Sequence, residues 1–231
     1  MSRRRRSRTT RSATPTKKTS TTRRKAPSGP RGKRKSTELS SPIAYVGLGS
    51  NVGNRRAHLQ AALSELARRA AIIRVSPLYC TAPVGFARQR DFWNAVVKLR
   101  WKGSAVSLLK KLAAIERSVG RTPTFRNGPR EIDLDLLDFG GEVRRRGAPR
   151  LPHPRMTERR FVLAPLAEVA PGWRHPVTGE TAPQLLAGLS RAPRVRRLAA
   201  RSLTATRPRG PGGRPAGSSP PRRSGRGTAS P

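Results

Sequence analysis

Apolar residues in the middle of the chain recur at spacings that predict alternating strands and helices. A mainly apolar run over 43–48 leads into Gly49-Ser50-Asn51, which predicts a buried strand ending in a glycine-rich turn. The following stretch predicts a helix, because its apolar residues return every three or four positions. These residues are Leu59, Ala62, Leu63 and Leu66. Asn54 stands where the N-cap of that helix is expected.

Two further strands are predicted after this helix. Residues 72–83 form one of them, and Pro77 within it predicts a bulge or an edge position because proline cannot donate to the ladder. Residues 91–101 form the other, with two different faces. One face is cleanly apolar and is expected in the core; it consists of Trp93, Ala95, Val97, Leu99 and Trp101. The opposite face carries Phe92 and Asn94.

A second helix and a fourth strand complete the predicted core. The helix has Ser104 as its N-cap and ends at Gly120, and a basic loop then leads to a strand over 131–140. The order is therefore β-α-β-β-α-β, which predicts an α+β fold, a two-layer sandwich of the ferredoxin-like type. C-terminal additions follow over 151–189, with a helix beginning near Thr157 and a further short helix.

The fourth predicted strand, EIDLDLLDFG, carries two aspartates inside an otherwise apolar run. Asp133 and Asp135 are two residues apart, so a strand points both carboxylates to one face. One interpretation is an amphipathic strand with a solvated face. Glu131 shares that face, whereas Asp138 has the opposite parity and is expected to be a strand-end residue.

The alternative interpretation is a magnesium–nucleotide site. The face carries acids only, and the loop before it holds Arg121, Arg126 and Arg130 in a chain that is otherwise strongly basic. Magnesium typically binds one or two carboxylates together with substrate phosphates, and arginines hold the remaining phosphate oxygens. The chain contains no G-x-x-x-x-G-K-[ST] sequence, so a P-loop enzyme is excluded.

Charge divides the chain into three parts. Residues 1–41 contain 15 Lys or Arg and one acid, and residues 191–231 contain 11 Arg and no acid, out of a net charge of +38. Both arms have almost no aromatic residues, so we expect them to be disordered around one folded domain over 42–190. No apolar run could span a membrane or serve as a secretory signal, and one cysteine, Cys80, excludes an internal disulfide. We expect a cytoplasmic protein, although the arginine- and serine-rich start overlaps with transit-peptide composition.

Several motifs occur together in an order that resembles a known family. They are AYVGLGSNVGN, YCTAPVG, DFWNAVVKLR, ERSVGR, RNGPREIDLDLLDFG and LPHPRMTERRFVLAPLAEVAP. Together they resemble 6-hydroxymethyl-7,8-dihydropterin pyrophosphokinase over roughly 43–189. The resemblance implies transfer of pyrophosphate from ATP to a reduced hydroxymethyl pterin, giving AMP, in folate biosynthesis. It also implies a ferredoxin-like fold, and we expect a monomer.

The same resemblance implies the site residues. Two Mg²⁺ ions would be held by Asp133 and Asp135, and Arg121, Arg126 and Arg130 would be catalytic. The residues implied to bind the nucleotide are Glu116, Arg121, Arg130, Leu136, His153 and Arg159. Those implied to bind the pterin are Thr81, Ala82, Val84, Phe92, Asn94 and Phe161. Glu131 matches no metal position in the family.

Other roles remain open for several of these residues. Arg121 could instead complement the dipole of the helix that it follows, and Arg126 could be a solvated loop charge. Glu116 could be an exposed helix residue, and Phe161 could pack inward. The chain also departs from the family. Asn127 stands where a Trp is common, and the loop is about one residue shorter. Before LPHP, where a basic residue and a threonine are common, this chain has RRRGAPR, so either Arg146 or Arg150 could take the place of the basic residue.

Two alternatives to an enzyme follow from the same sequence. The basic arms could contact nucleic acid, and without aromatic residues such contact would be weak, non-specific and sensitive to salt. They could equally be extensions without a role. The domain itself could be only a nucleotide- or metal-binding module, an alternative that the complete set of motifs disfavours.

Overall fold

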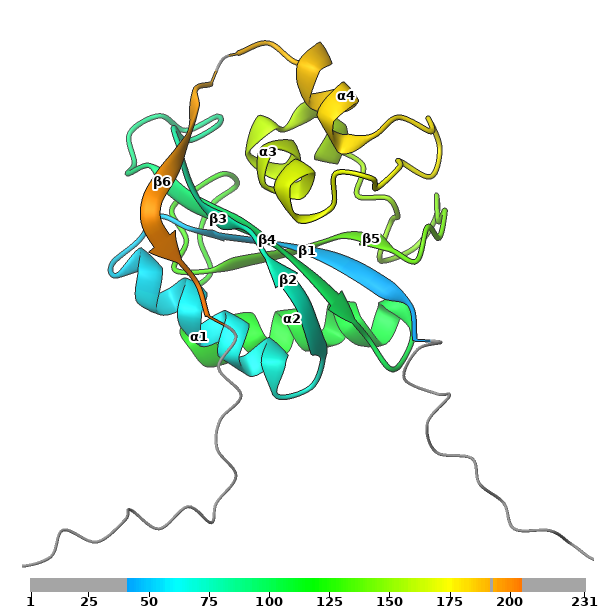
Figure 1. Ribbon diagram of the computed structural model, residues 1–231. Helices are drawn as coiled ribbons and strands as arrows, with labels where there is room; N and C mark the ends of the chain where they lie inside the picture. Colours follow the sequence, from blue (N-terminus) through cyan, green and yellow to red (C-terminus); the bar gives the residue numbers. More distant parts are fainter. Residues whose placement is uncertain (1–40, 192, 205–231) are drawn as a thin grey trace, which may run out of the picture. The chain divides into compact units, whose positions relative to one another are not determined.

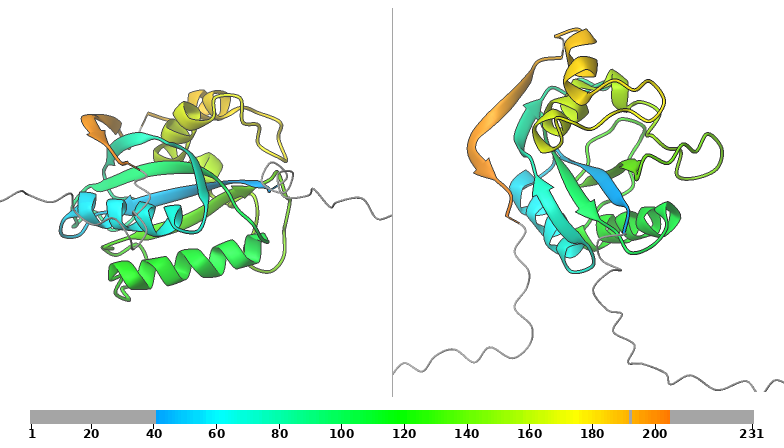
Figure 2. Two further views of the ribbon diagram at one scale, coloured as in Figure 1. Left: turned by 60° about the horizontal axis from the view of Figure 1, so that its bottom comes forward. Right: turned by 45° about the vertical axis from the view of Figure 1, so that its right-hand side comes forward.

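The computed structural model describes residues 41–191 and 193–204. Within them lies one six-stranded antiparallel sheet with helices on both faces (Figures 1 and 2). The strands are β1 (Ile43–Ser50), β2 (Ala71–Val75), β3 (Pro77–Thr81), β4 (Phe92–Arg100), β5 (Asp133–Phe139) and β6 (Val195–Ser202). The helices are α1 (Arg55–Ala67), α2 (Ala105–Val119), α3 (Arg160–Val169) and α4 (Ala182–Gly188), with a 3-10 turn η1 (Met156–Glu158) before α3.

The strand order in the sheet is β5-β1-β4-β3-β6, with β2 also paired to β4. The predicted second strand is divided into β2 and β3 at Ser76, directly before Pro77. Ser76 maintains the ladder there, because its Oγ accepts from Val96 N at 2.9 Å and its N–H donates to Val96 O at 2.9 Å. The predicted order of strands and helices is confirmed, with this break in its second strand.

Both core helices begin where their capping residues predict, and α2 also ends where predicted. Asn54 Oδ1 accepts from Ala57 N at 3.1 Å at the start of α1, and Ser104 Oγ accepts from Ser107 N at 3.2 Å at the start of α2. Gly120 ends α2 with φ 101°, a left-handed conformation that residues with a Cβ rarely adopt.

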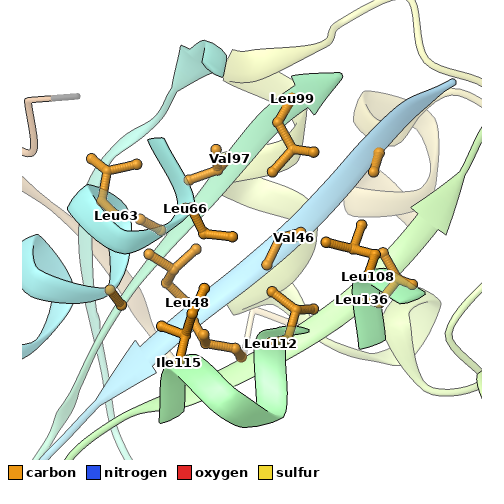
Figure 3. Packing of buried hydrophobic residues seen from close by; sticks show 14 of the residues in the cluster. Val46, Leu48, Leu63, Leu66, Val97, Leu99, Leu108, Leu112, Ile115 and Leu136 are labelled. Atoms are coloured by element: carbon orange, nitrogen blue, oxygen red, sulfur yellow. The ribbon is translucent and has the colours of Figure 1, made fainter. Parts of the chain in front are cut away.

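The main core lies between the sheet and helices α1 and α2. Figure 3 shows Leu63 of α1 and Leu112 of α2 in the same cluster as Val46 of β1 and Leu99 of β4, and each of these side chains is fully or almost fully buried. Ala95 and Val97 of β4 join this cluster, as the cleanly apolar face predicted. Truncating one such leucine to alanine costs about 2–5 kcal/mol.

Helices α3 and α4 cover the opposite face of the sheet and add a layer to the predicted sandwich (Figure 2). Their cluster includes Tyr45 of β1, Val96 of β4, Leu163 and Leu166 of α3, and Trp173. This second cluster leaves part of the sheet face uncovered at the starts of β5 and α3, where a cavity opens.

The expectation that Asp138 has the opposite parity to Asp133 and Asp135 is wrong, although Asp138 does lie at the strand end, one residue before the last of β5. The register between β1 and β5 shifts between Tyr45 and Val46, so that Tyr45 pairs with Asp138 while Val46 pairs with Leu136. This bulge inserts Leu137 and returns Asp138 to the face that carries Asp135. Asp138 is 2% exposed, and its Oδ2 accepts from Trp173 Nε1 at 3.1 Å.

The expected C-terminal boundary at residue 190 also requires correction. Strand β6 lies beyond it and pairs with β3. Leu203 belongs to the main core and is 5% exposed. The side chain of Gln60 in α1 donates a hydrogen bond to Thr204 O and accepts one from Thr204 N. Apolar Val195 and Leu198 are separated by arginines, so composition concealed this strand. Most of both arms, 1–40 and 205–231, lies outside the described residues.

No helix within 41–191 and 193–204 combines the length and the apolar character that crossing a membrane requires.

Candidate active site

The aspartates of β5 lie on the floor of a cavity of about 370 Å³. Asp133 pairs with Gly49 and Asp135 with Gly47 of β1, so both carboxylates project from the face that α3 covers in part. Both glycines line the same cavity as the two carboxylates. The predicted alignment of the aspartate pair is therefore present.

Two arginines flank Asp133. Arg130 Nη1 donates to Asp133 Oδ2 at 2.7 Å, and Arg121 Nη1 lies 3.0 Å from Asp133 Oδ1. Arg121 also donates to Glu116, whose Oε1 accepts from Leu134 N at 2.7 Å. Glu116 thus joins the end of α2 to the start of β5, and its side chain is only 13% exposed, so it is not a solvated helix residue.

The surroundings of Asp135 shift its acidity. Burial, and secondarily the charge of Asp133, raise the pKa of Asp135 above its ordinary value. Arg159 Nη1 lies 3.6 Å from Asp135 Oδ2 and favours the ionised carboxylate. Burial lowers the pKa of nearby His153, against the opposing charge of Asp135. A cation bound here in place of the arginines would contact the carboxylates of both Asp133 and Asp135.

A second cavity, of about 480 Å³, lies on the other side of Asp135. Its wall brings together Leu136 and His153, which are implied to bind the nucleotide, and Arg126, which is implied to be catalytic. Arg150 also lines it, which identifies one arginine of the 144–150 segment as facing this space. Asp135 and Arg155 line both cavities, so the carboxylate stands at the junction between them.

All six residues implied for the pterin line the first cavity, namely Thr81, Ala82, Val84, Phe92, Asn94 and Phe161. Asn94 is 6% exposed, and its Nδ2 donates to Thr81 Oγ1 at 2.7 Å. That bond fixes the orientation of the amide. Its Oδ1 then lies beside Gly49, within the cavity wall.

The remaining predicted residues take different places. Arg130 and Arg159 line the first cavity, next to the six pterin-side residues. Glu116 and Arg121 belong to neither cavity wall and adjoin the site through Asp133. Glu131, which matches no metal position in the family, accepts from Thr122 N and Thr122 Oγ1 and lies two residues before the start of β5.

Sequence reasoning missed part of the wall. Arg155, Glu158 and Arg160 line the first cavity from the turn before α3 and from its first residue. Their charges in HPRMTERRF were the available signal. Leu189, Ser190 and Pro193 line it from the segment after α4, where no motif marked them. Arg160 fixes that segment, because its Nη1 donates to Leu186 O and Leu189 O at 3.2 and 3.1 Å.

The donor set fits magnesium better than a metal that needs an all-protein cage. Within the described part of the chain, no group of three or more His, Cys, Asp or Glu side chains could hold an ion. Two carboxylates are nevertheless sufficient for Mg²⁺ when phosphates and waters complete its shell. Arg130 Nε is buried without an acceptor among the described residues, and a phosphate oxygen at the site would satisfy it.

Comparison with known proteins places these features in a family. Residues 45–171 match the family model described as 7,8-dihydro-6-hydroxymethylpterin-pyrophosphokinase (HPPK). A 2-amino-4-hydroxy-6-hydroxymethyldihydropteridine pyrophosphokinase from Bacillus subtilis is 44% identical over 129 residues, which cover 55% of this chain and 77% of that protein. A protein of the same name from Pseudomonas aeruginosa is 42% identical over 156 residues, covering 64% of this chain and 96% of the relative.

A solved structure agrees at the level of the fold. The crystal structure of Plasmodium falciparum HPPK-DHPS wild type with pterin and p-hydroxybenzoate superimposes with a TM-score of 0.52 at 17% identity. The match covers 66% of this chain and 42% of that chain, so this chain spans less than half of the solved one.

Proposed function

Because the chain belongs to the 7,8-dihydro-6-hydroxymethylpterin-pyrophosphokinase family, we propose that its two cavities hold the two substrates of that reaction. The enzyme is an ATP-dependent diphosphotransferase of folate biosynthesis that transfers pyrophosphate from ATP to the hydroxymethyl group of a dihydropterin. The observation that carries the proposal is the position of Asp135 at the junction of a slot containing aromatic residues and a cavity containing basic residues.

The pterin belongs in the first cavity. Phe92 and Phe161 supply aromatic faces for a flat ring, and Asn94 Oδ1 supplies an acceptor for its amide edge. Thr81 holds that acceptor in place through the bond to Asn94 Nδ2. Ala82 and Val84 border the slot from the loop that follows β3.

The triphosphate belongs along the arginines and into the second cavity. Arg126 and His153 line that cavity, while Arg121 and Arg130 pair with Asp133, which lines the first cavity together with Asp135. Charge moves onto the oxygen bridging the α- and β-phosphates as the bond breaks, and fixed guanidinium groups stabilise it there. Glu116 orients Arg121, Leu136 lines the nucleotide wall, and Arg159 offers a further donor.

Asp133 and Asp135 would hold magnesium, and we propose two ions. Bound magnesium supplies charge neutralisation for the phosphates and acidifies the pterin hydroxyl. The arginines that now pair with Asp133 would then contact phosphate oxygens, since their present partner would be shared with the ions.

An assay of the adenine nucleotide product tests this function. Full-length protein, ATP, magnesium and 6-hydroxymethyl-7,8-dihydropterin should yield AMP and the pterin diphosphate. Formation of ADP would indicate transfer of a single phosphoryl group and would reject the pyrophosphokinase mechanism. Omission of the pterin is the control, and it should abolish AMP formation.

The architecture around the site completes the proposal. We propose that the βαββαβ core is of the ferredoxin-like type, supported by the order β5-β1-β4-β3 in the sheet. A folded domain running from about residue 42 through β6, acting as a monomer in the cytoplasm, is also part of the proposal.

We further propose that any contact of the basic arms with nucleic acid is electrostatic. The arms offer arginine and lysine but almost no aromatic surface for stacking. Binding of a DNA duplex at low and high salt by the full chain and by residues 41–204 tests this. Equal affinity of the two proteins would exclude binding through the arms.

A further inference from the structure

Two loops that border opposite parts of the site contact each other at their tips. The pterin-side loop (82–91) follows β3, and the arginine loop (121–130) follows α2. The rings of Phe86 and Phe125 meet edge to face, with centroids 5.2 Å apart and planes at 90°. Beside them, Gln89 Nε2 donates to Asn127 O at 2.9 Å. The two loops therefore form a joined pair at the mouth of the first cavity.

The same two loops are also joined at their bases by one buried amide. Asn51, 1% exposed, donates from Nδ2 to Gln89 Oε1 at 2.8 Å and to Arg90 O at 3.1 Å. Its Oδ1 accepts from Arg130 N at 2.7 Å. Asn51 thus fixes the C-terminal ends of both loops, while the ring pair joins their tips.

Burial in the core does not account for the ring pair. Phe86 and Phe125 remain 39% and 56% exposed, and neither belongs to the two apolar clusters of the fold. Their chain neighbours do face the site: Val84 lines the first cavity and Arg126 lines the second. Contact between the rings therefore ties a wall of the pterin slot to an arginine of the nucleotide cavity.

We propose that the Phe86–Phe125 pair is a latch that positions the two loops, so that nucleotide bound on the arginine loop strengthens pterin binding. The inference rests on the proposed function, because it assigns the two loops to different substrates. Asn127, with φ 61°, offers its carbonyl to Gln89 and places its side chain beside Gly85, so the two loops also meet next to the rings. Phe86 and Phe125 are positioning residues and take no part in the chemistry.

The latch is tested by a double-mutant cycle on substrate coupling. The dissociation constant of the hydroxymethyl dihydropterin is measured with and without a non-hydrolysable ATP analogue and Mg²⁺. The proteins are the full chain, Phe86→Ala, Phe125→Ala and the double variant. An edge-to-face pair predicts that each single variant loses about 2- to 12-fold of the strengthening by the analogue. The double variant should lose no more than either single one.

Two controls accompany the cycle. Phe125→Tyr keeps the ring and should keep the coupling, and Val177→Ala removes an exposed apolar side chain outside both cavities and should change nothing. Since both rings are exposed, the melting temperature of each alanine variant should match that of the full chain. A fall comparable to the loss of a core residue would make the pair structural and overturn the latch.

Failure of the latch and failure of the function are distinguishable. If the full chain forms AMP but the analogue strengthens pterin binding equally in all variants, the latch is wrong and the pyrophosphokinase function stands. Additive losses in the double variant, or no strengthening in the full chain, would also overturn the latch alone. A full chain that forms no AMP would remove both.

Discussion

Arg130 Nη1 lies 2.7 Å from Asp133 Oδ2, three residues further along the chain, at the start of β5. Arg130 is the last residue of the basic loop, and Asp133 is the first residue of the strand. The short segment between them therefore places a phosphate-binding group next to a metal ligand. Arg121 approaches the other oxygen of Asp133 from the end of α2. Two arginines therefore balance the negative charge of Asp133 before any substrate binds.

Replacement of Arg121 separates its two interpretations. If its guanidinium serves the triphosphate, Arg121→Ala should lower kcat for AMP formation by about 100-fold or more. If it only complements the dipole of α2, the loss should be confined to about 0.3–1 kcal/mol of stability. Arg117→Ala is the matched control, because Arg117 lies in the last turn of the same helix and is exposed. Equal kcat values for the two variants would reject the catalytic role.

Gly49 is required by the shape of the pterin slot. A Cβ at this position would lie 3.1 Å from Asn94 Oδ1, so Asn94, which is held by its bond to Thr81, would have to shift by a few tenths of an ångström. Gly49→Ala should therefore raise the KM for the pterin more than the KM for ATP. Gly47→Ala is the control, because its Cβ would meet Leu137 Cδ2 at an ordinary 3.6 Å. A larger effect at Gly47 than at Gly49 would contradict this account of the slot.

Asp138 should give the stability of the protein a distinctive pH dependence. Burial raises the pKa of Asp138 above its ordinary value of 3.8, despite the bond from Trp173 and the nearby His175. The unfolded chain then binds fewer protons than the folded one, so the free energy of unfolding falls as pH rises above 3.8 and levels off above the raised pKa. Tyr45, opposite Asp138, stays neutral throughout this range.

Asp138→Asn removes this titration, and its carbonyl oxygen can still accept from Trp173. Urea unfolding from pH 4 to 7 should show that the variant loses less stability with rising pH than the parent chain does. Parallel pH profiles for the two proteins would mean that ionisation of Asp138 does not lower the free energy of unfolding.

Strand β6 should be required for stability, although it lies in the arginine-rich C-terminal segment. Truncation after Thr204 should leave the melting temperature unchanged. Truncation after Ser190 removes the β3–β6 ladder and the buried Leu203, and exposes the edge of β3. We expect a loss of about 2 kcal/mol or more, on the scale of one deleted core side chain. Equal melting temperatures for the two truncated proteins would show that β6 does not stabilise the folded domain.

Periodicity predicted the central fold well because each element carries its own signal. The β4 face from Trp93 to Trp101 alternates strictly, and Asn54 and Ser104 mark helix starts that the structure confirms. The bulge opposite Tyr45 and Val46 has no local signal, because Leu136 and Leu137 are equally apolar; parity therefore failed for Asp138. Strand β6 was missed because it depends on pairing with β3, which its composition does not reveal.

The residues of the site also fall into two groups, those that the sequence reveals and those that only the fold brings together. Motif residues such as Asp133 and Asn94 could be named from the chain, and they line the first cavity. Leu189 and Pro193 reach the same wall only through the folding back of the chain after α4. Asn51 joins two loops through bonds to residues 38, 39 and 79 positions away, which local spacing cannot indicate.

The most direct test of the central claim measures AMP formation by Asp133→Ala and Asp135→Ala beside the full chain, across a magnesium titration. We predict near-total loss of turnover in both variants at every magnesium concentration, with unchanged melting temperatures, because each carboxylate would hold metal. Turnover retained by either variant would contradict the assignment of the aspartate pair on β5 as the metal site.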